Sequence, residues 1–289
     1  MLLLGGGTSG FRANEQAYRG MFRLLAEEHI PFGVVDNLDR IGNRSVDLVI
    51  APGEVPPGLQ PYVENGGRVI IAGSGAPPFD MGKVVKLWKD PDGAYFRVCD
   101  HAMFPSLKSV GVVFFYGDYL EVDAKGPLTL IPPSVYGPPE LVKVGWKDTD
   151  APGPIFKDFG SGKVAWLPWD LGSLYYKHSS EAHAGLMRDL IDRLLPNGRQ
   201  LKTDAHPLVE ITLMRQKNRT LMHFINISGH SQTAYFSAVP MTGIKVQVTG
   251  AFRSARAIRA GRTIALARAG EYTTFTLPSL KEYKLVELQ

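Results

Sequence analysis

The sequence predicts an α/β protein in which a doubly wound sheet is followed by a small antiparallel β-sandwich. Three observations carry this prediction. Short apolar runs alternate with helical periodicity over the first part of the chain, and the run VDLVIA at 46–51 is apolar enough for a central parallel strand. From about residue 206 the apolar period changes to two. We expect an α/β domain over residues 1–200 and a β-sandwich domain over 201–289.

The first part opens with alternating strands and helices. Strands are predicted over 2–4, 32–35, 46–51 and 69–72. A short helix is predicted over 59–65 and a longer one over 15–28. Spacings of three and four give the longer helix an apolar face made of Tyr18, Met21, Phe22 and Leu25. This repeated order with short connections predicts a right-handed, doubly wound sheet.

The rest of the first domain is less regular. Residues 83–160 are rich in Pro and Gly, with short β-like pieces at 110–116 and 128–131, and we interpret them as an elaboration on the sheet. A further strand is predicted over 163–168. An amphipathic helix over 181–195 closes the domain before a Pro-Asn-Gly turn.

The second part alternates apolar and polar residues with turns at short intervals. Apolar Val209, Ile211 and Leu213 alternate with Glu210, Thr212 and Met214, which is typical of a strand in an antiparallel sheet. Further strands are predicted over 220–227, 244–248, 263–267 and 272–277. His223 falls inside one of them and is interpreted as a half-buried sheet residue.

Composition excludes several classes of protein. A formal net charge of +4 without any run of consecutive basic residues does not predict nucleic-acid binding. No stretch of about 18 apolar residues is present and the first residues lack the basic region of a signal peptide, so a soluble chain is expected, with no membrane partner. The single cysteine, Cys99, cannot form an intrachain disulfide. The cytoplasm is slightly favoured, and the compartment is left open.

Several segments, taken in order, resemble a known family. They are YRGMFRLLAEEHIPFGVVD, PYVENGGRVIIAGSG, PPSVYGPPE, GSGKVAWLPWDLGSLYY and LVEITLMRQKNRTLMHFINISGHSQTAYF. Together they resemble the region downstream of the catalytic barrel in bacterial glycoside hydrolases related to family 42 β-galactosidases. The resemblance covers nearly the whole chain.

The resemblance implies a fold and a role. The first part looks like the trimerisation-type middle domain of those enzymes, which has a flavodoxin-like, class I glutamine amidotransferase-like fold, and the second part looks like their C-terminal β-domain. In those enzymes a (β/α)₈ barrel supplies the catalytic carboxylates, and this sequence has no room for a barrel before residue 1. The implied role is a non-catalytic accessory and oligomerisation module that forms a homo-oligomer. Its implied partners are carbohydrate or a catalytic barrel.

Ser74 is the candidate nucleophile. The segment Ala72-Gly73-Ser74-Gly75-Ala76 has the small residues that a nucleophile elbow needs on both sides of its nucleophile. In the amidotransferase pattern this position would be cysteine. Pro78 restricts the residue before it, so a helix directly after Ser74 is not expected, and Trp169-Asp170-Leu171 stands where those enzymes carry His-x-Glu. We interpret the segment as a glycine-rich turn; the alternative is a stand-alone hydrolase or amidotransferase-like enzyme that uses Ser74.

Carboxylates and aromatic residues mark a second candidate site. Sugars stack on aromatic rings and bond to carboxylates, so we expect a ligand-binding surface near the carboxyl edge of the sheet. Its candidate residues are Ser74, Tyr136, Glu140, Trp169, Asp170 and Tyr175. Trp166 is interpreted as a core residue. The other acidic residues considered for glycoside hydrolysis are interpreted mostly as solvated loop charges: Asp118, Glu121, Asp123, Asp148 and Asp150.

A nucleotide-binding oxidoreductase is the second alternative. Gly5, Gly7 and Gly10 give a G-x-G-x-x-G pattern after the first strand, and Asp36 follows the second strand where a dinucleotide-binding carboxylate would stand. The helix begins later than that fold requires. No cofactor is therefore predicted.

The remaining reactive groups are interpreted structurally. Cys99 precedes Asp100 and His101, but adjacent residues on an extended chain point to opposite sides, so we expect a buried, inert thiol. His178 and His183 lie five apart, off the spacing of paired metal ligands on a helix, and no metal site is predicted. The basic cluster is expected to be solvated; it consists of Arg253, Arg256, Arg259, Arg262 and Arg268.

Overall fold

The structure of the protein is a computed structural model. The structure describes residues 1–5, 15–35, 41, 46–53, 55, 58–91, 93–133, 137–138, 140, 149–231 and 233–289. The chain divides into two compact units. The first unit consists of Met1–Leu24 and Phe32–Gly198, and the second consists of Leu25–Pro31 and Arg199–Gln289. The segment Leu25–Pro31 thus belongs with the C-terminal part of the chain, which no pattern in the sequence indicated.

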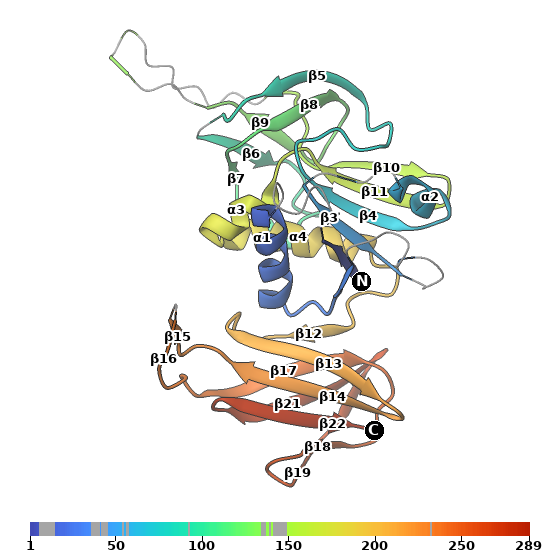
Figure 1. Cartoon of the computed structure of the whole chain (residues 1–289), viewed down its shortest axis with the longest axis vertical. Coiled ribbons are helices and arrows are strands. Elements are labelled where there is room, and N and C mark those ends of the chain that lie inside the picture. Colours follow the sequence, from blue (N-terminus) through green and yellow to red (C-terminus); the bar gives the residue numbers. More distant parts are fainter. Residues whose placement is uncertain are drawn as a thin grey trace. The chain divides into compact units, whose positions relative to one another are not determined.

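The first unit is built on a main sheet (Figure 1). Among the described residues its strand order is β10-β11-β4-β3-β1-β2. All neighbours pair in parallel except β10, which is antiparallel to β11. These strands are β1 (Leu2–Leu4), β2 (Gly33–Val35), β3 (Val49–Pro52), β4 (Arg68–Ala72), β10 (Ile155–Phe159) and β11 (Gly162–Leu167). Because the parallel strands run the same way, the turns that follow β3, β4 and β11 meet at one edge.

Apolar residues on both faces make β3 and β4 the centre of this sheet. Every residue of β3 is buried, and β4 is buried from Val69 to Ala72. A sheet covered on both faces selects such continuous apolar runs. Val69 and Ile71 join a core cluster with Leu59 of α2 and Trp166 of β11. Trp166 is 1% exposed, which confirms its prediction as a core residue.

The helices are α1 (Glu15–Glu27), α2 (Leu59–Glu64), α3 (Leu171–His178) and α4 (Glu181–Leu194). They belong to the first unit, except that α1 enters the second unit at Leu25. Their positions confirm three predicted helices, whereas α3 was not predicted. Met21 and Leu25 of the predicted apolar face of α1 are buried as expected, whereas Tyr18 is only half-buried. The buried residues of α1 also include Ala17 and Leu24, while Phe22 is 43% exposed and meets Phe32 edge to face with ring centroids 5.1 Å apart.

Two glycines allow α1 and α3 to touch through their backbones. A Cβ atom on Gly20 would lie 1.8 Å from the Gly172 carbonyl oxygen, and one on Gly172 would lie 2.2 Å from the Ala17 carbonyl oxygen. Real Cβ atoms do not approach backbone that closely, so neither position tolerates a side chain without movement of a helix. Figure 1 shows α1, α3 and α4 grouped together, and α4 also contacts β4.

Residues 83–131 form two small sheets and a short helical turn rather than irregular chain. Within the described residues, β5 pairs antiparallel with β8, and β6 lies between β7 and β9. The elements are β5 (Lys83–Trp88), β6 (Ala94–Val98), η2 (Pro105–Leu107), β7 (Val112–Phe115), β8 (Tyr119–Asp123) and β9 (Leu128–Ile131). The β-like piece expected at 128–131 is β9, and the one expected at 110–116 contains β7. On β5, Val84 and Val85 are 50% and 57% exposed.

The second unit consists of antiparallel strands. Among the described residues, one sheet has the order β12-β17-β21-β20 and another has the order β13-β14-β22-β18-β19, with a small β15-β16 pair beside them. Buried residues of both larger sheets, among them Phe224, Val246 and Val286, form one core cluster. The strands are β12 (Leu201–Thr203), β13 (Val209–Gln216), β14 (Arg219–Asn226), β15 (His230–Ser231), β16 (Ala234–Tyr235), β17 (Met241–Thr249), β18 (Ala255–Ala257), β19 (Arg262–Ile264), β20 (Ala267–Ala269), β21 (Tyr272–Leu280) and β22 (Tyr283–Leu288).

Side chains of the second unit mostly lie as predicted. His223 is half-buried on β14, where its Nδ1 lies 2.8 Å from the Tyr283 hydroxyl. The arginines of the basic cluster are exposed. The strand predicted over 263–267 is corrected: β19 ends at Ile264 in one sheet and β20 begins at Ala267 in the other. In the segment that joins this unit from the earlier part of the chain, His29 Nε2 donates a hydrogen bond to the Val209 carbonyl at 2.8 Å.

His183 is a titratable group in the core of the first unit. It lies on α4 with no solvent exposure, and its Nε2 donates to the Phe114 carbonyl at 2.8 Å. A carbonyl can only accept, so Nε2 carries a proton. Nδ1 has no hydrogen-bond partner among the described residues. Burial lowers the pKa of this histidine to about 4, against the opposing effect of the Phe114 hydrogen bond.

Replacing His183 with Gln should reduce the acid sensitivity of the first unit. The folded pKa of about 4 lies below the unfolded value of 6.5, so the unfolded chain binds more protons between these pH values. The neutral His183 ring therefore makes its full contribution to the free energy of unfolding above pH 6.5. About 3 kcal/mol of this free energy is lost as the pH falls from 6.5 toward 4. Denaturant unfolding of wild type and His183→Gln at neutral and acidic pH should show a smaller loss in the variant.

His101 supplies the control for this measurement. It is exposed, and its Nδ1 lies 3.1 Å from the Leu107 carbonyl oxygen. The His101→Gln variant should keep the wild-type pH dependence. If His183→Gln loses as much stability in acid as the wild type, the assignment to His183 is wrong.

Candidate functional site

The turns at the carboxyl edge of the main sheet are held together by the backbone of Gly73. Its N–H donates to the Leu167 carbonyl at 3.0 Å, and its own carbonyl accepts from Trp166 Nε1 at 3.0 Å. The turn after β3 is joined to the end of β4 as well, because Gly53 N–H donates to the Ala72 carbonyl at 2.6 Å. A Cβ atom on Gly73 would lie 2.4 Å from the Gly53 carbonyl oxygen. The edge is therefore closely packed where a ligand could otherwise enter between β3 and β4.

Ser74 follows directly, in a half-buried position. Residues 73–82 turn and bend without forming a helix, and the chain then enters β5. A nucleophile elbow needs a strand, a tight turn and a helix in succession, so this segment has the small residues of an elbow without its geometry. Within the described residues, no hydrogen bond joins the Ser74 hydroxyl to a histidine or a carboxylate.

His178 is the histidine nearest in sequence to β11, but it lies at the end of α3 that is farther from the carboxyl edge of the sheet. His178 is the final residue of α3, which begins after Asp170 at the carboxyl edge. Eight helical residues span about 12 Å at 1.5 Å each, so α3 carries His178 away from that edge. The His178 ring meets Phe114 and Tyr116 edge to face, with centroids 5.6 Å and 5.1 Å apart.

Asp170 has a structural partner that the sequence did not reveal. Its Oδ1 accepts from Ser173 N–H at 2.9 Å and its Oδ2 accepts from Ser173 Oγ at 2.5 Å, which makes it the N-cap of α3. Burial raises the pKa of this carboxyl group, and the bonds from Ser173 oppose the rise. Both oxygens are thus engaged in starting the helix.

Two of the aromatic residues proposed for a ligand surface, Trp169 and Tyr175, are buried. Trp169 has no solvent exposure, and its ring centroid lies 4.4 Å from that of Phe96 in a buried aromatic cluster. Tyr175 is 4% exposed. These two rings belong to the core, which corrects the expectation that they face a sugar. Glu140 is exposed in a turn, and Tyr136 lies outside the described residues.

Other candidates fall in different places. Cys99 is exposed rather than buried, and its Sγ lies 3.4 Å from Thr129 Oγ1. Its neighbour His101 bonds to the Leu107 carbonyl instead. In the part of the chain that the structure describes, no group of His, Cys, Asp and Glu could hold a metal ion. Of the proposed nucleotide loop, Gly7, Gly10 and Asp36 lie outside the described residues. No helix in the described ranges is long and apolar enough to cross a membrane.

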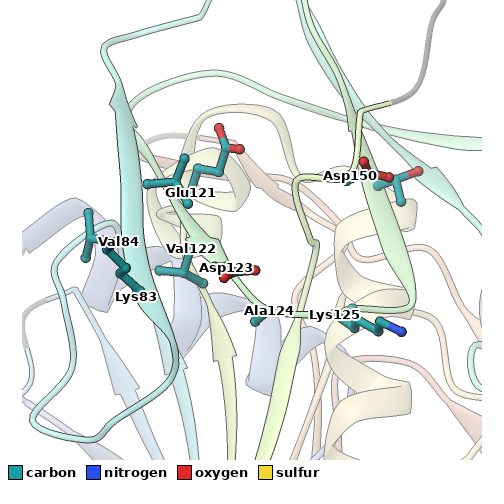
Figure 2. Close-up of a pocket in the computed structure, with 11 residues that line it drawn as sticks. Lys83, Val84, Glu121, Val122, Asp123, Ala124, Lys125 and Asp150 are labelled. Atoms are coloured by element: carbon teal, nitrogen blue, oxygen red, sulfur yellow. The ribbon is translucent and has the colours of Figure 1, made fainter.

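A surface groove lies beside β5 and β8, and none of the predicted ligand-binding residues lines it. We call it the β5–β8 groove; its cavity volume is 980 Å³. Figure 2 shows Glu121 and Asp123 on β8, with Asp150 across from them. Its lining residues are Lys83, Val84, Val85, Glu121, Val122, Asp123, Ala124, Lys125, Gly126, Thr129 and Asp150. Glu121, Asp123 and Asp150 were among the carboxylates interpreted as solvated loop charges, and the structure brings them together around this groove.

Glu121 is held in place by a tryptophan. Its Oε2 accepts from Trp88 Nε1 at 2.7 Å, and the Lys86 ammonium lies 3.8 Å from the centroid of the Trp88 ring. Asp118 is not part of the groove. It pairs with the Lys89 ammonium at 2.7 Å, and this hydrogen bond holds the pKa of the Asp118 carboxyl below its usual value. Glu121 and Asp123 are two residues apart on β8, so they lie on the same face of the strand. This spacing is the feature of the sequence that could have indicated a carboxylate-lined surface.

Solved structures with the same fold come from glycoside hydrolases. The α-L-fucosidase isoenzyme 2 from Paenibacillus thiaminolyticus matches with a TM-score of 0.74 at 17% identity, over 100% of this chain and 48% of that chain. The β-galactosidase Gan42B from G. stearothermophilus matches with a TM-score of 0.58 at 12% identity, over 99% of this chain and 40% of that chain. No protein-family model and no curated protein matches the sequence.

A third match is of the same kind. The β-galactosidase from Bacillus circulans sp. alkalophilus has a TM-score of 0.54 at 14% identity, over 96% of this chain and 38% of that chain. The chain therefore has a mixed α/β fold that occurs as part of larger glycoside hydrolase chains. It spans less than half the length of each of these chains.

Removing the cap of α3 should lower stability without any ligand present. Asp170→Ala leaves the N–H of Ser173 without its acceptor, and the expected loss in the free energy of unfolding is about 1 kcal/mol. Asp170→Asn keeps an amide oxygen in the same place and should lose much less. Denaturant unfolding of the two variants measures the difference. Equal losses in both, or no loss in Asp170→Ala, would contradict a capping role.

Proposed function

We propose that this chain is a non-catalytic accessory and oligomerisation module of a carbohydrate-active, glycoside hydrolase-like protein. It works with a catalytic (β/α)₈ barrel that is supplied by the same protein or by a separate subunit. The reaction takes place on the barrel, and this module supports assembly around it.

The packing around Gly73 is the observation that carries the proposal. Both polar backbone groups of Gly73 are used to join β4 to β11, and Ser74 follows in a bend without a helix behind it. A serine nucleophile needs a base that accepts its proton. The residues that follow β11 supply a helix cap, Asp170, in place of that base.

The fold supports the same proposal. The parallel strands follow one another in the order β2-β1-β3-β4-β11, the order 2-1-3-4-5 of flavodoxin-like doubly wound sheets. On this basis we assign residues 1–200 to an amidotransferase-like domain in which Ser74 replaces the cysteine, and residues 201–289 to a β-sandwich. The glycoside hydrolases with this fold carry more than half of their chains outside the matched part.

Wild type and Ser74→Ala should be equally inactive. Because no proton acceptor is bonded to Ser74 among the described residues, neither protein should turn over aryl esters, aryl amides or aryl glycosides above the buffer rate. Release of the aryl group, followed by absorbance, measures the reaction. Turnover by the wild type that disappears in Ser74→Ala would overturn the proposal in favour of a stand-alone hydrolase.

The isolated chain should form a homo-oligomer. Light scattering coupled to size-exclusion chromatography should give a mass that is a multiple of the chain mass of 31.7 kDa. Dilution should shift the mass downward if the subunits exchange. A mass of one chain at every concentration tested would contradict the oligomerisation part of the proposal and leave the non-catalytic part standing.

A further inference from the structure

We propose that the β5–β8 groove binds a neutral oligosaccharide. The class of ligand rests on the proposed function, whereas the position of the site rests on the geometry of the groove. Nothing in the sequence pattern had separated this groove from the surrounding charged surface.

The size of the groove suits a ligand with more than one sugar ring. Its volume of 980 Å³ lies at the upper end of the range for small-molecule sites, about 300–1,000 Å³. The lining comes from β5, β8, the start of β9 and the segment that contains Asp150. Several elements of the first unit therefore contribute to a single concave surface.

The charges around the groove favour a neutral ligand rich in hydroxyl groups. Carboxylates of Glu121, Asp123 and Asp150 stand together with the ammonium groups of Lys83 and Lys125. A strongly anionic or cationic ligand would meet charges of its own sign there. A sugar hydroxyl donates to a carboxylate and accepts from an ammonium group, so it can satisfy both kinds of side chain at once.

A β-bulge shapes the wall of the groove. The pairing of β5 with β8 shifts between Val84 and Lys86, so Val85 is an extra residue on β5. Bulges re-aim side chains, and here the consecutive residues Lys83, Val84 and Val85 all line the groove. Both valines are half-exposed or more, and the C–H face of a sugar ring would cover them.

Glu121 is prepared for such a ligand. The Trp88 indole holds Oε2 at 2.7 Å, which fixes the carboxylate with one donor. A carboxylate has several further lone-pair sites, so Glu121 can still accept from a hydroxyl group. Fixing the side chain beforehand reduces the conformational entropy that is lost on binding.

The test is calorimetric titration of the full chain with neutral and charged trisaccharides. Galactotriose, xylotriose and cellotriose are the neutral probes, and trigalacturonic acid is the anionic one. We expect at least one neutral trisaccharide to bind, and Asp123→Asn together with Asp150→Asn to weaken its binding about tenfold or more, as expected for lost hydrogen bonds to charged groups. Trigalacturonic acid should bind more weakly than the neutral sugar.

Two further variants make the result specific. Asp158→Asn alters an exposed carboxylate that pairs with Lys163 outside the groove and should bind like the wild type. Tyr116→Ala removes a half-buried ring outside the groove and should also leave binding unchanged. Unfolding midpoints equal to that of the wild type show that the groove variants are folded.

Several outcomes would overturn the inference. They are the absence of binding by every neutral probe, unchanged binding in the groove variants, tighter binding of trigalacturonic acid, and loss of binding in Tyr116→Ala alone. The proposed function is tested separately by turnover and by mass, so failure of binding removes the groove as a sugar site without deciding the role of the module.

Discussion

The packing of Gly73 against its neighbours is the constraint on which the first unit depends. The peptide groups on either side of this glycine join β4 to β11, and its missing side chain lets the turn after β3 come within contact. The carboxyl edge of an open α/β sheet is where ligands usually bind. Here that edge is filled by backbone and by the Trp166 indole.

Asp170, Asp189 and His183 of the first unit are largely buried polar residues, and each makes a hydrogen bond that holds the fold together. Asp170 starts α3, and Asp189 accepts from the N–H and the hydroxyl of Ser106 at 2.9 Å and 2.7 Å. His183 ties α4 to β7 through the Phe114 carbonyl. Burying a polar group is costly unless it is hydrogen-bonded, so these residues stabilise the fold only in their present arrangement. Carboxylates free to meet a ligand are found instead at the surface, around the β5–β8 groove.

The sequence predicted the elements with strong local signals and missed those that depend on distant contacts. The apolar runs at β3 and β4 could be placed because their burial shows in consecutive residues. Helix α3 was missed because its aromatic side chains and its cap, Asp170, resembled a ligand surface, and only the packing of Trp169 against Phe96 shows that this segment is core. The groove could not be predicted, since Asp150 joins Glu121 only through the folding of β8 and β9.

The exposed strand β5 also affects whether copies of this chain can associate by pairing their strands. Within the described residues β5 pairs with β8 alone, so its outer edge can accept another strand, and its valines would favour such an addition. Lysines at 83, 86 and 89 flank these valines. Two copies aligned along this edge would bring these like charges together, which disfavours edge-to-edge pairing of β5 with a second β5.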